Sequence, residues 1–279
     1  MLHSVGGAAP RKITSDVPQQ VHGTRATVGG QLVYAIGDVH GRYDLLKELL
    51  ARISADAAAR AQGRRPVLIF CGDYVDRGPD SAKVVDALVW LRRRDAFDLH
   101  LLKGNHDGML LDFIEEPTGL AEWLRQDGAQ TLRSYGVHPP AEADAAGVIA
   151  ARDELLDAMP ASHLELLRSL KLMVSVGDYA FVHAGVRPGR ALQAQAEEDL
   201  LWIRDDFIDD PGPFPKVIVH GHSWNDDKPR LLSHRVGIDT GAYQTGVLTA
   251  VRLEDRKVAV IQAYSGLSLN GGWDAGGPD

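Results

Sequence analysis

The chain has a single cysteine, Cys71, in 279 residues, so it cannot form an internal disulfide. Cys71 closes an apolar run that starts at Val67, where a buried and unreactive thiol is expected. No apolar stretch approaches the roughly 20 residues that span a bilayer, and the N-terminus lacks the apolar core of a signal peptide. These absences predict a cytoplasmic protein without a membrane partner.

Basic residues do not outnumber acidic residues in this chain. The chain has 30 Lys and Arg against 38 Asp and Glu, which gives a net charge of -8. An acidic chain gains nothing from the counterion release that drives binding to nucleic acids, so a nucleic-acid scaffold is disfavoured as a partner. The length suits one large domain with a sizeable core.

The two ends of the chain differ in composition from its middle. Residues 1–30 are rich in small and polar residues without periodicity, which predicts a disordered leader. We expect the ordered domain to span residues 31–267 and a flexible tail to span residues 268–279.

A strand followed by a polar loop recurs three times in the first half. The predicted strands are Leu32–Ile36, Val67–Phe70 and Leu99–Leu102. Gly-Asp follows the first two and Gly-Asn the third, and helical periodicity follows the first two loops. Repeated units of this kind predict parallel strands whose carboxyl ends meet at one edge of a sheet, where ligands bind.

The second half has a different pattern. Residues 108–170 have helical character and predict an insertion, in which Trp123, like Trp90 before it, has the spacing of a helix core position. Further strands are predicted at Met173–Val176, Tyr179–His183, Val217–His220, Gly246–Leu253 and Val258–Ile261. The predicted fold class is α/β, with two packed mixed β-sheets flanked by helices and a helical insertion.

Ligand-type side chains lie directly after five predicted strands. They are Asp38, His40, Asp73, Asn105, His183 and His222. Taken singly, an Asp after a strand is often a helix cap and a lone His is more often structural. Five strand ends that carry such residues together predict a metal site, and carboxylates mixed with imidazoles suit Mn, Fe or Zn. A carboxylate that bridges two ions can activate water and clamp phosphate oxygens.

These residues belong to five sequence motifs that resemble those of a known protein family. Gly37-Asp38-Val39-His40-Gly41, Gly72-Asp73-Tyr74-Val75-Asp76-Arg77-Gly78 and Gly104-Asn105-His106-Asp107 are followed by Val182-His183-Ala184-Gly185 and Val219-His220-Gly221-His222. Over residues 32–265, the chain resembles the phosphoprotein phosphatase branch of the calcineurin-like metallophosphoesterases. The likeness is strongest to bacterial and bacteriophage serine/threonine protein phosphatases and to the symmetrical diadenosine tetraphosphate hydrolases.

The resemblance implies a role for each matching residue. Two metal ions, expected to be Mn with Fe or Zn as alternatives, would share Asp73. Asp38 and His40 would complete the first site, and Asn105, His183 and His222 the second. His106 would be the general acid paired with Asp76, and Arg77 and Arg204 would bind phosphate. The implied activity is hydrolysis of phosphate monoesters by a hydroxide bound at the dinuclear centre.

Three functions compete on the sequence alone. The favoured one is a serine/threonine phosphoprotein phosphatase, because Asp76 beside Arg77 is typical of those enzymes and helps to protonate a poor alkoxide leaving group. The alternative is a symmetrical dinucleoside polyphosphate hydrolase. Asp107 and the segment Gly78-Pro79-Asp80-Ser81 resemble the residues at these positions in the motifs of those enzymes. The third, a metal-binding scaffold without activity, is disfavoured since no expected ligand or acid is missing. The expected partner is a phosphorylated protein or a small phosphoester.

Overall fold

Two β-sheets lie in the centre of the computed structural model, which describes residues 19–23, 25–120, 123–140 and 144–265. The six-stranded sheet has the order β1-β11-β10-β2-β3-β4. Its strands are β1 (Gln19–Gly23), β2 (Leu32–Ile36), β3 (Val67–Phe70), β4 (Asp98–Leu101), β10 (Val247–Glu254) and β11 (Lys257–Tyr264). Strands β2, β3 and β4 are parallel, whereas β10 is antiparallel to both β2 and β11, so the sheet is mixed.

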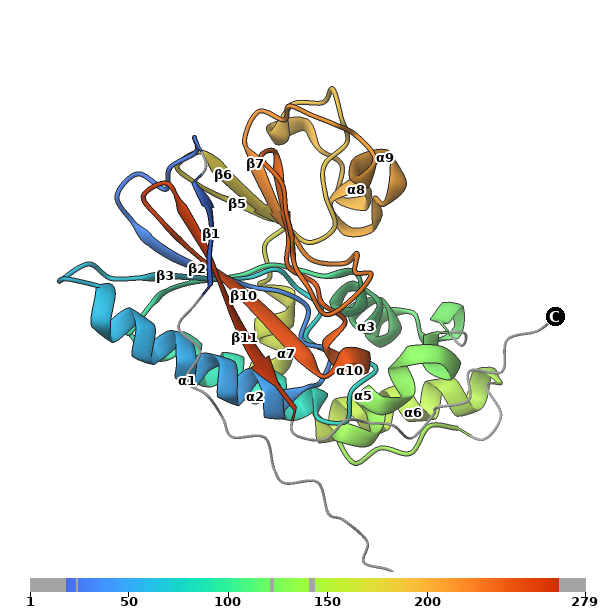
Figure 1. Cartoon of the computed structure of the whole chain (residues 1–279). Coiled ribbons are helices and arrows are strands. Elements are labelled where there is room, and N and C mark those ends of the chain that lie inside the picture. The colour runs from blue at the N-terminus through green and yellow to red at the C-terminus, as the bar shows by residue number, and fades with distance from the viewer. Residues whose placement is uncertain (1–18, 24, 121–122, 141–143, 266–279) are drawn as a thin grey trace, which may run out of the picture.

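The second sheet has five strands in the order β5-β6-β7-β9-β8 and is also mixed. Its strands are β5 (Met173–Val176), β6 (Tyr179–Val182), β7 (Val217–His220), β8 (Arg230–Leu231) and β9 (Arg235–Gly237). Helices cover the outer faces of both sheets (Figure 1). The predicted fold class, two packed mixed sheets flanked by helices, is confirmed.

Alternation along the strands builds these layers, because successive side chains of a strand point to opposite faces. In β2, Tyr34 and Ile36 join the core beneath helices α1 (Tyr43–Arg60) and α2 (Ser81–Arg92), whereas Val33 and Ala35 join the core between the sheets. On the far side, Val182 of β6 packs with residues of helices α8 (Glu197–Trp202) and α9 (Asp205–Ile208).

The insertion is helical as predicted, with different boundaries. Its elements are α3 (Asn105–Glu115), a 3-10 turn (Pro117–Leu120), a π-helix (Leu124–Gly128), α5 (Ala129–Ser134), α6 (Ala145–Ala158) and α7 (Ala161–Arg168). The helical character expected over residues 108–170 is interrupted at Pro160, between α6 and α7, because Pro160 lacks the N–H that a continuous helix requires.

The N-terminal segment departs from the prediction of a disordered leader. Within residues 1–30, β1 pairs antiparallel with β11, whose edge would otherwise present unpaired backbone groups. Residues 1–18 of the leader and the tail residues 268–279 lie outside the described residues. Strands β8 and β9, with two and three residues, were too short to be predicted from their periodicity.

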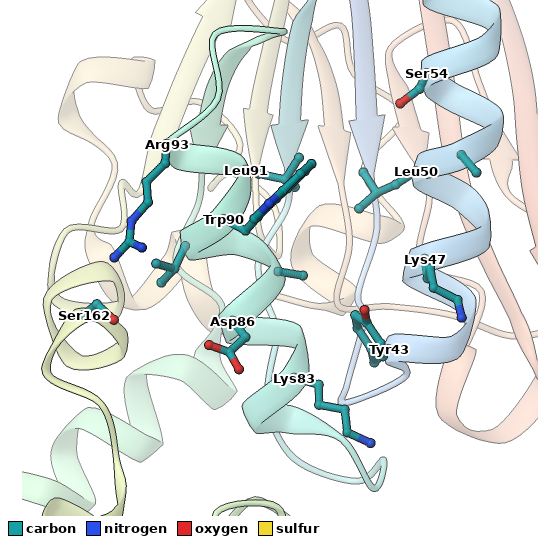
Figure 2. Close-up of a pocket in the computed structure, with 13 residues that line it drawn as sticks. Tyr43, Lys47, Leu50, Ser54, Lys83, Asp86, Trp90, Leu91, Arg93 and Ser162 are labelled. Carbon is teal, nitrogen blue, oxygen red and sulfur yellow. The ribbon is translucent and has the colours of Figure 1, made fainter.

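Trp90 differs from its predicted core position, since its side chain is 55% exposed. It lines a groove of about 700 Å³ between α1 and α2, together with Tyr43, Lys47 and Leu50 (Figure 2). Leu91 beside it is buried in the core, whereas Trp90 lines the groove with both apolar and charged neighbours. No helix in the described ranges is both long and apolar enough to cross a bilayer.

Candidate metal centre

The six predicted ligands come together at the carboxyl ends of strands from both sheets. Asp38 and His40 follow β2, Asp73 follows β3, and His183 and His222 follow β6 and β7. Asn105 begins α3, after β4. All six are buried. A cavity of about 190 Å³ is lined by Asp38, His40, Asp73, Arg77, Asn105, His106, Met109, Asp127, Trp202, Arg204 and His222.

The predicted phosphate-binding and acid residues lie at the same place. Arg77 and Arg204 both line the cavity, and the guanidinium of Arg77 lies over the ring of Tyr243 at 4.6 Å. Asp76 is fully buried. Its carboxylate lies 2.7 Å from Nδ1 of His106, and His106 lines the cavity. Eight of the ten residues that the sequence singled out therefore line one cavity, and the other two, Asp76 and His183, contact lining residues.

Unusual backbone conformations aim the ligands inward. His40, Asp73 and His222 have positive φ angles of 44°, 52° and 62°, a region that costs free energy for residues other than glycine. Glycines allow the close approach of neighbouring chains. A Cβ on Gly221 would lie 1.9 Å from Asp38 Oδ1, and one on Gly104 would lie 2.0 Å from Asp73 Oδ1. Packing thus enforces a strained geometry, as is typical of functional sites.

Two groups of side chains could each hold a cation. One consists of His40, Asp73 and His106, the other of Asp73, His183 and His222, and within each group the ligand atoms lie within 4.8 Å of one another. Asp73 belongs to both groups, as expected of a bridging carboxylate. Buried atoms without a hydrogen-bond partner among the described residues include Asp38 Oδ1 and His222 Nε2. Because such atoms are costly to bury unpaired, they fit a site that is completed by a metal ion.

Hydrogen bonds prepare two of the imidazoles as ligands. His40 Nδ1 is 2.9 Å from the carbonyl of Val75, and His183 Nδ1 is 2.8 Å from the carbonyl of Cys71. A carbonyl only accepts, so each Nδ1 donates and each Nε2 keeps its lone pair, 3.4 and 3.5 Å from the Asp73 carboxylate. Burial also lowers the pKa of His40 to about 3 and lowers that of His183. Both rings are therefore neutral at pH 7, as a metal ligand must be.

His106 lies close enough to His40 and Asp73 to join the first group, but its two nitrogens are already engaged. Nδ1 donates to Asp76, and Nε2 accepts from the Arg77 guanidinium at 3.2 Å, a cationic neighbour that disfavours a metal ion there. Burial lowers the pKa of His106, but the charge of Asp73 and the hydrogen bond to Asp76 outweigh it, so the pKa lies above its ordinary value. The bond from Nδ1 to Asp76 and the raised pKa favour an imidazolium, in which an Nε2 proton would replace the contact with Arg77. The ring then fits a proton donor better than a metal ligand.

Three residues outside the ten predicted site residues shape the site: Asp107, which the motifs contain, and Asp239 and Trp123, whose parts in it were not expected. Asp107 accepts hydrogen bonds from the backbone N–H groups of Asp73, Tyr74 and Gly104, at 2.9 to 3.0 Å. Asp239 follows β9 and is buried, and burial raises its pKa to about 6. The short run Gly237-Ile238-Asp239 repeats the pattern of strand end and acid, and could have revealed it. Trp123, expected to be a packing residue, donates its indole N–H to Asp76.

A comparison with protein families accounts for this arrangement. Residues 32–261 match the model of the calcineurin-like phosphoesterase family. The chain belongs to that family. This metallophosphoesterase is 34% identical to a symmetrical bis(5'-nucleosyl)-tetraphosphatase of Nitrosospira multiformis, over 84% of this chain and 97% of the relative. It is 26% identical to serine/threonine-protein phosphatase 1 of Salmonella typhimurium, over 85% of this chain and 99% of the relative.

Solved structures agree with the fold. A crystal structure of a protein proposed to be a diadenosine tetraphosphatase matches the phosphoesterase with a TM-score of 0.55 and 20% identity, covering 88% of this chain and 100% of the other. The family predicted from the five motifs is thus confirmed, and the centre is a candidate dinuclear metal site of a hydrolase.

Proposed function

We propose that this phosphoesterase hydrolyses dinucleoside polyphosphates symmetrically, so that diadenosine tetraphosphate and water give two molecules of ADP. The observation that carries the proposal is the 34% identity to a symmetrical bis(5'-nucleosyl)-tetraphosphatase, which extends over 97% of that relative. The serine/threonine phosphatase favoured by the motifs alone has the weaker support, with 26% identity to its relative.

The cavity offers groups that suit a nucleotide with several phosphates. Arg77 and Arg204 supply two guanidinium groups, which bind phosphate oxygens through paired hydrogen bonds. Trp202 lines the same cavity and is 46% exposed, so its indole face is available to stack on a nucleobase.

Each side chain has a distinct part in the proposed reaction. A pair of cations, which we propose to be Mn, would be held by Asp38, His40, Asp73, Asn105, His183 and His222. When bound, the pair would activate water and neutralise charge on the phosphate oxygens. Arg77 and Arg204 would orient the scissile phosphate. His106, held through Nδ1 by Asp76, would donate its Nε2 proton to the oxygen that leaves with ADP.

A second candidate is dephosphorylation of phosphoserine or phosphothreonine. Its support is the 2.7 Å contact between Asp76 and His106, because a carboxylate that orients the acid matters most for a poor alkoxide leaving group. ADP is a better leaving group and needs less help with protonation.

The two candidates can be separated by measuring kcat/KM for diadenosine tetraphosphate and for a phosphoserine peptide, both with Mn at the same pH. We expect the dinucleotide to be the better substrate and ADP to be the sole nucleotide product. Equal amounts of AMP and ATP would contradict symmetrical cleavage. A higher kcat/KM for the phosphopeptide would favour the second candidate and leave the metal centre unaffected.

A further inference from the structure

The carboxylate of Asp76 is fully buried and accepts three hydrogen bonds from side chains. Oδ2 accepts from His106 Nδ1 at 2.7 Å and from Trp123 Nε1 at 2.7 Å, and Oδ1 accepts from Thr131 Oγ1 at 2.6 Å. Asp76 also has a positive φ of 70°, so its backbone alone does not favour this position. The partners other than His106 belong to the helical insertion, 47 and 55 residues further along the chain.

The indole of Trp123 is itself fixed in place. It is 5% exposed, and its ring lies 5.0 Å from that of Phe113. A Cβ on Gly128 would lie 2.5 Å from the indole ring, so only glycine leaves room for the ring there. Trp123 precedes the π-helix Leu124–Gly128, an element that often marks functional sites. The insertion thus delivers one N–H donor, with little freedom to move, to the carboxylate that holds His106.

We propose that Trp123 is a positioning residue for proton donation, which acts through Asp76 on His106. Asp76 Oδ2 lies between the indole N–H and the imidazole N–H, so the indole limits rotation of the carboxylate and keeps the imidazole directed at the cavity. Without the indole N–H, Thr131 would be the one partner besides His106 that the described residues offer to this carboxylate. The inference rests on the proposed role of His106 as general acid and is independent of which phosphoester is the natural substrate.

The direct test is Trp123→Phe, which keeps an aromatic ring against Phe113 but removes the N–H. We expect kcat for phenyl phosphate, whose leaving group needs a proton, to fall about tenfold, as for the loss of one hydrogen bond to a charged group. For para-nitrophenyl phosphate, whose leaving group needs little protonation, we expect a loss of less than about threefold. Metal content and KM should stay close to those of the wild type. Trp90→Phe, on exposed α2 surface, is the matched control and should change neither rate. Equal losses on both substrates would overturn the proposal.

A double variant separates positioning from a general loss of structure. In a His106→Asn background, Trp123→Phe should have no further effect on phenyl phosphate, because no acid remains to be positioned. A further loss of the same size as in the wild type would contradict the proposal. If Trp123→Phe does not fold, Gly128→Ala provides the second route, since its added methyl group must displace the indole. Gly128→Ala should then reproduce the selective loss on phenyl phosphate, and an unchanged ratio of the two rates would contradict the proposal.

The same measurements distinguish failure of this inference from failure of the proposed function. If His106→Asn alone lowers both substrates equally, the acid role of His106 is wrong and the positioning role falls with it. If His106→Asn lowers the rate on phenyl phosphate more than the rate on para-nitrophenyl phosphate, and Trp123→Phe changes neither rate, only the role of Trp123 is wrong. Neither result depends on whether the enzyme prefers dinucleotides.

Discussion

At the scale of single residues, the site is a set of polar side chains buried at the ends of apolar strands. Burial alone would be unfavourable for each, because buried polar groups require partners. Backbone carbonyls satisfy His40 and His183 at Nδ1, and backbone N–H groups satisfy Asp107. Asp38 Oδ1 has no such partner among the described residues, and Asp38 lines the cavity where a cation is expected. A side chain whose hydrogen-bonding atoms all have protein partners supports the site, whereas one with an atom left unpaired is a candidate metal ligand.

Asp107 gives a first prediction at this scale. Asp107→Asn would set an amide NH₂ group against backbone N–H donors of the Asp73 loop, which leaves buried donors unpaired. We expect the free energy of unfolding to fall by about 1–3 kcal/mol, with weaker metal binding because Asp73 is less well held. Urea unfolding and metal titration measure the two effects. Asp112→Asn, on the exposed side of the same helix, is the control and should change neither. Unchanged metal affinity in Asp107→Asn would mean that Asp107 does not support the bridging loop.

At the scale of elements, the strand ends act as the platform for the centre. Strand β7 brings Gly221 against the carboxylate of Asp38 at the end of β2, so the two sheets touch through a glycine. His222 N donates to Asp38 Oδ2 at 2.9 Å, which fixes the same carboxylate from the other side. The spacing between the sheets at this edge therefore depends on the absence of one side chain.

Gly221→Ala tests this contact between elements. The added methyl group would overlap Asp38 Oδ1, so Asp38 must move away from the first metal position. We expect a loss of one bound cation and at least a tenfold lower kcat, because small displacements of catalytic groups cost about that much or more. Gly119→Ala, which would add a methyl group in open space, should behave like the wild type. Full metal occupancy in Gly221→Ala would contradict the account of this edge.

The elements also show what a sequence can and cannot predict. The first two strand–loop–helix units were predictable because apolar runs, Gly-Asp pairs and helical periodicity agree over many residues. Strand β1 was not, because its pairing partner β11 lies more than 200 residues away and its own composition is that of a leader. All ten candidate site residues could be named from motifs. The contact of Trp123 with Asp76 could not, because periodicity indicates which face of a helix is buried and not which partner the N–H of an indole meets.

At the scale of the whole molecule, the centre joins the two sheets. Asp38, His40 and Asp73 come from the first sheet, and His183 and His222 from the second. Cations bound to both sets would therefore link the halves of the fold, and binding to the folded state alone must stabilise it. Removal of metal should affect stability as well as activity.

Thermal unfolding with and without metal tests this link. At a free Mn concentration of 100 times Kd, the stabilisation is about 2.7 kcal/mol per site. For a domain of this size, that corresponds to an increase in Tm of roughly 5–10 °C for each site, so about 10–20 °C when both sites are filled. Asp73→Asn, which weakens both sites, should have a Tm that barely responds to Mn. A large Mn response in Asp73→Asn would place the stabilising ion elsewhere.

The most direct test of the central claim is a titration of activity against bound metal. Chelator-treated enzyme is loaded with increasing Mn, and the hydrolysis of para-nitrophenyl phosphate and the metal content per chain are measured on the same samples. We expect no turnover without metal and a rate that reaches its plateau when two ions are bound per chain. Asp73→Asn should reach neither the occupancy nor the rate. Full activity in the chelator-treated enzyme, or a plateau at one ion per chain, would contradict a dinuclear phosphoesterase centre.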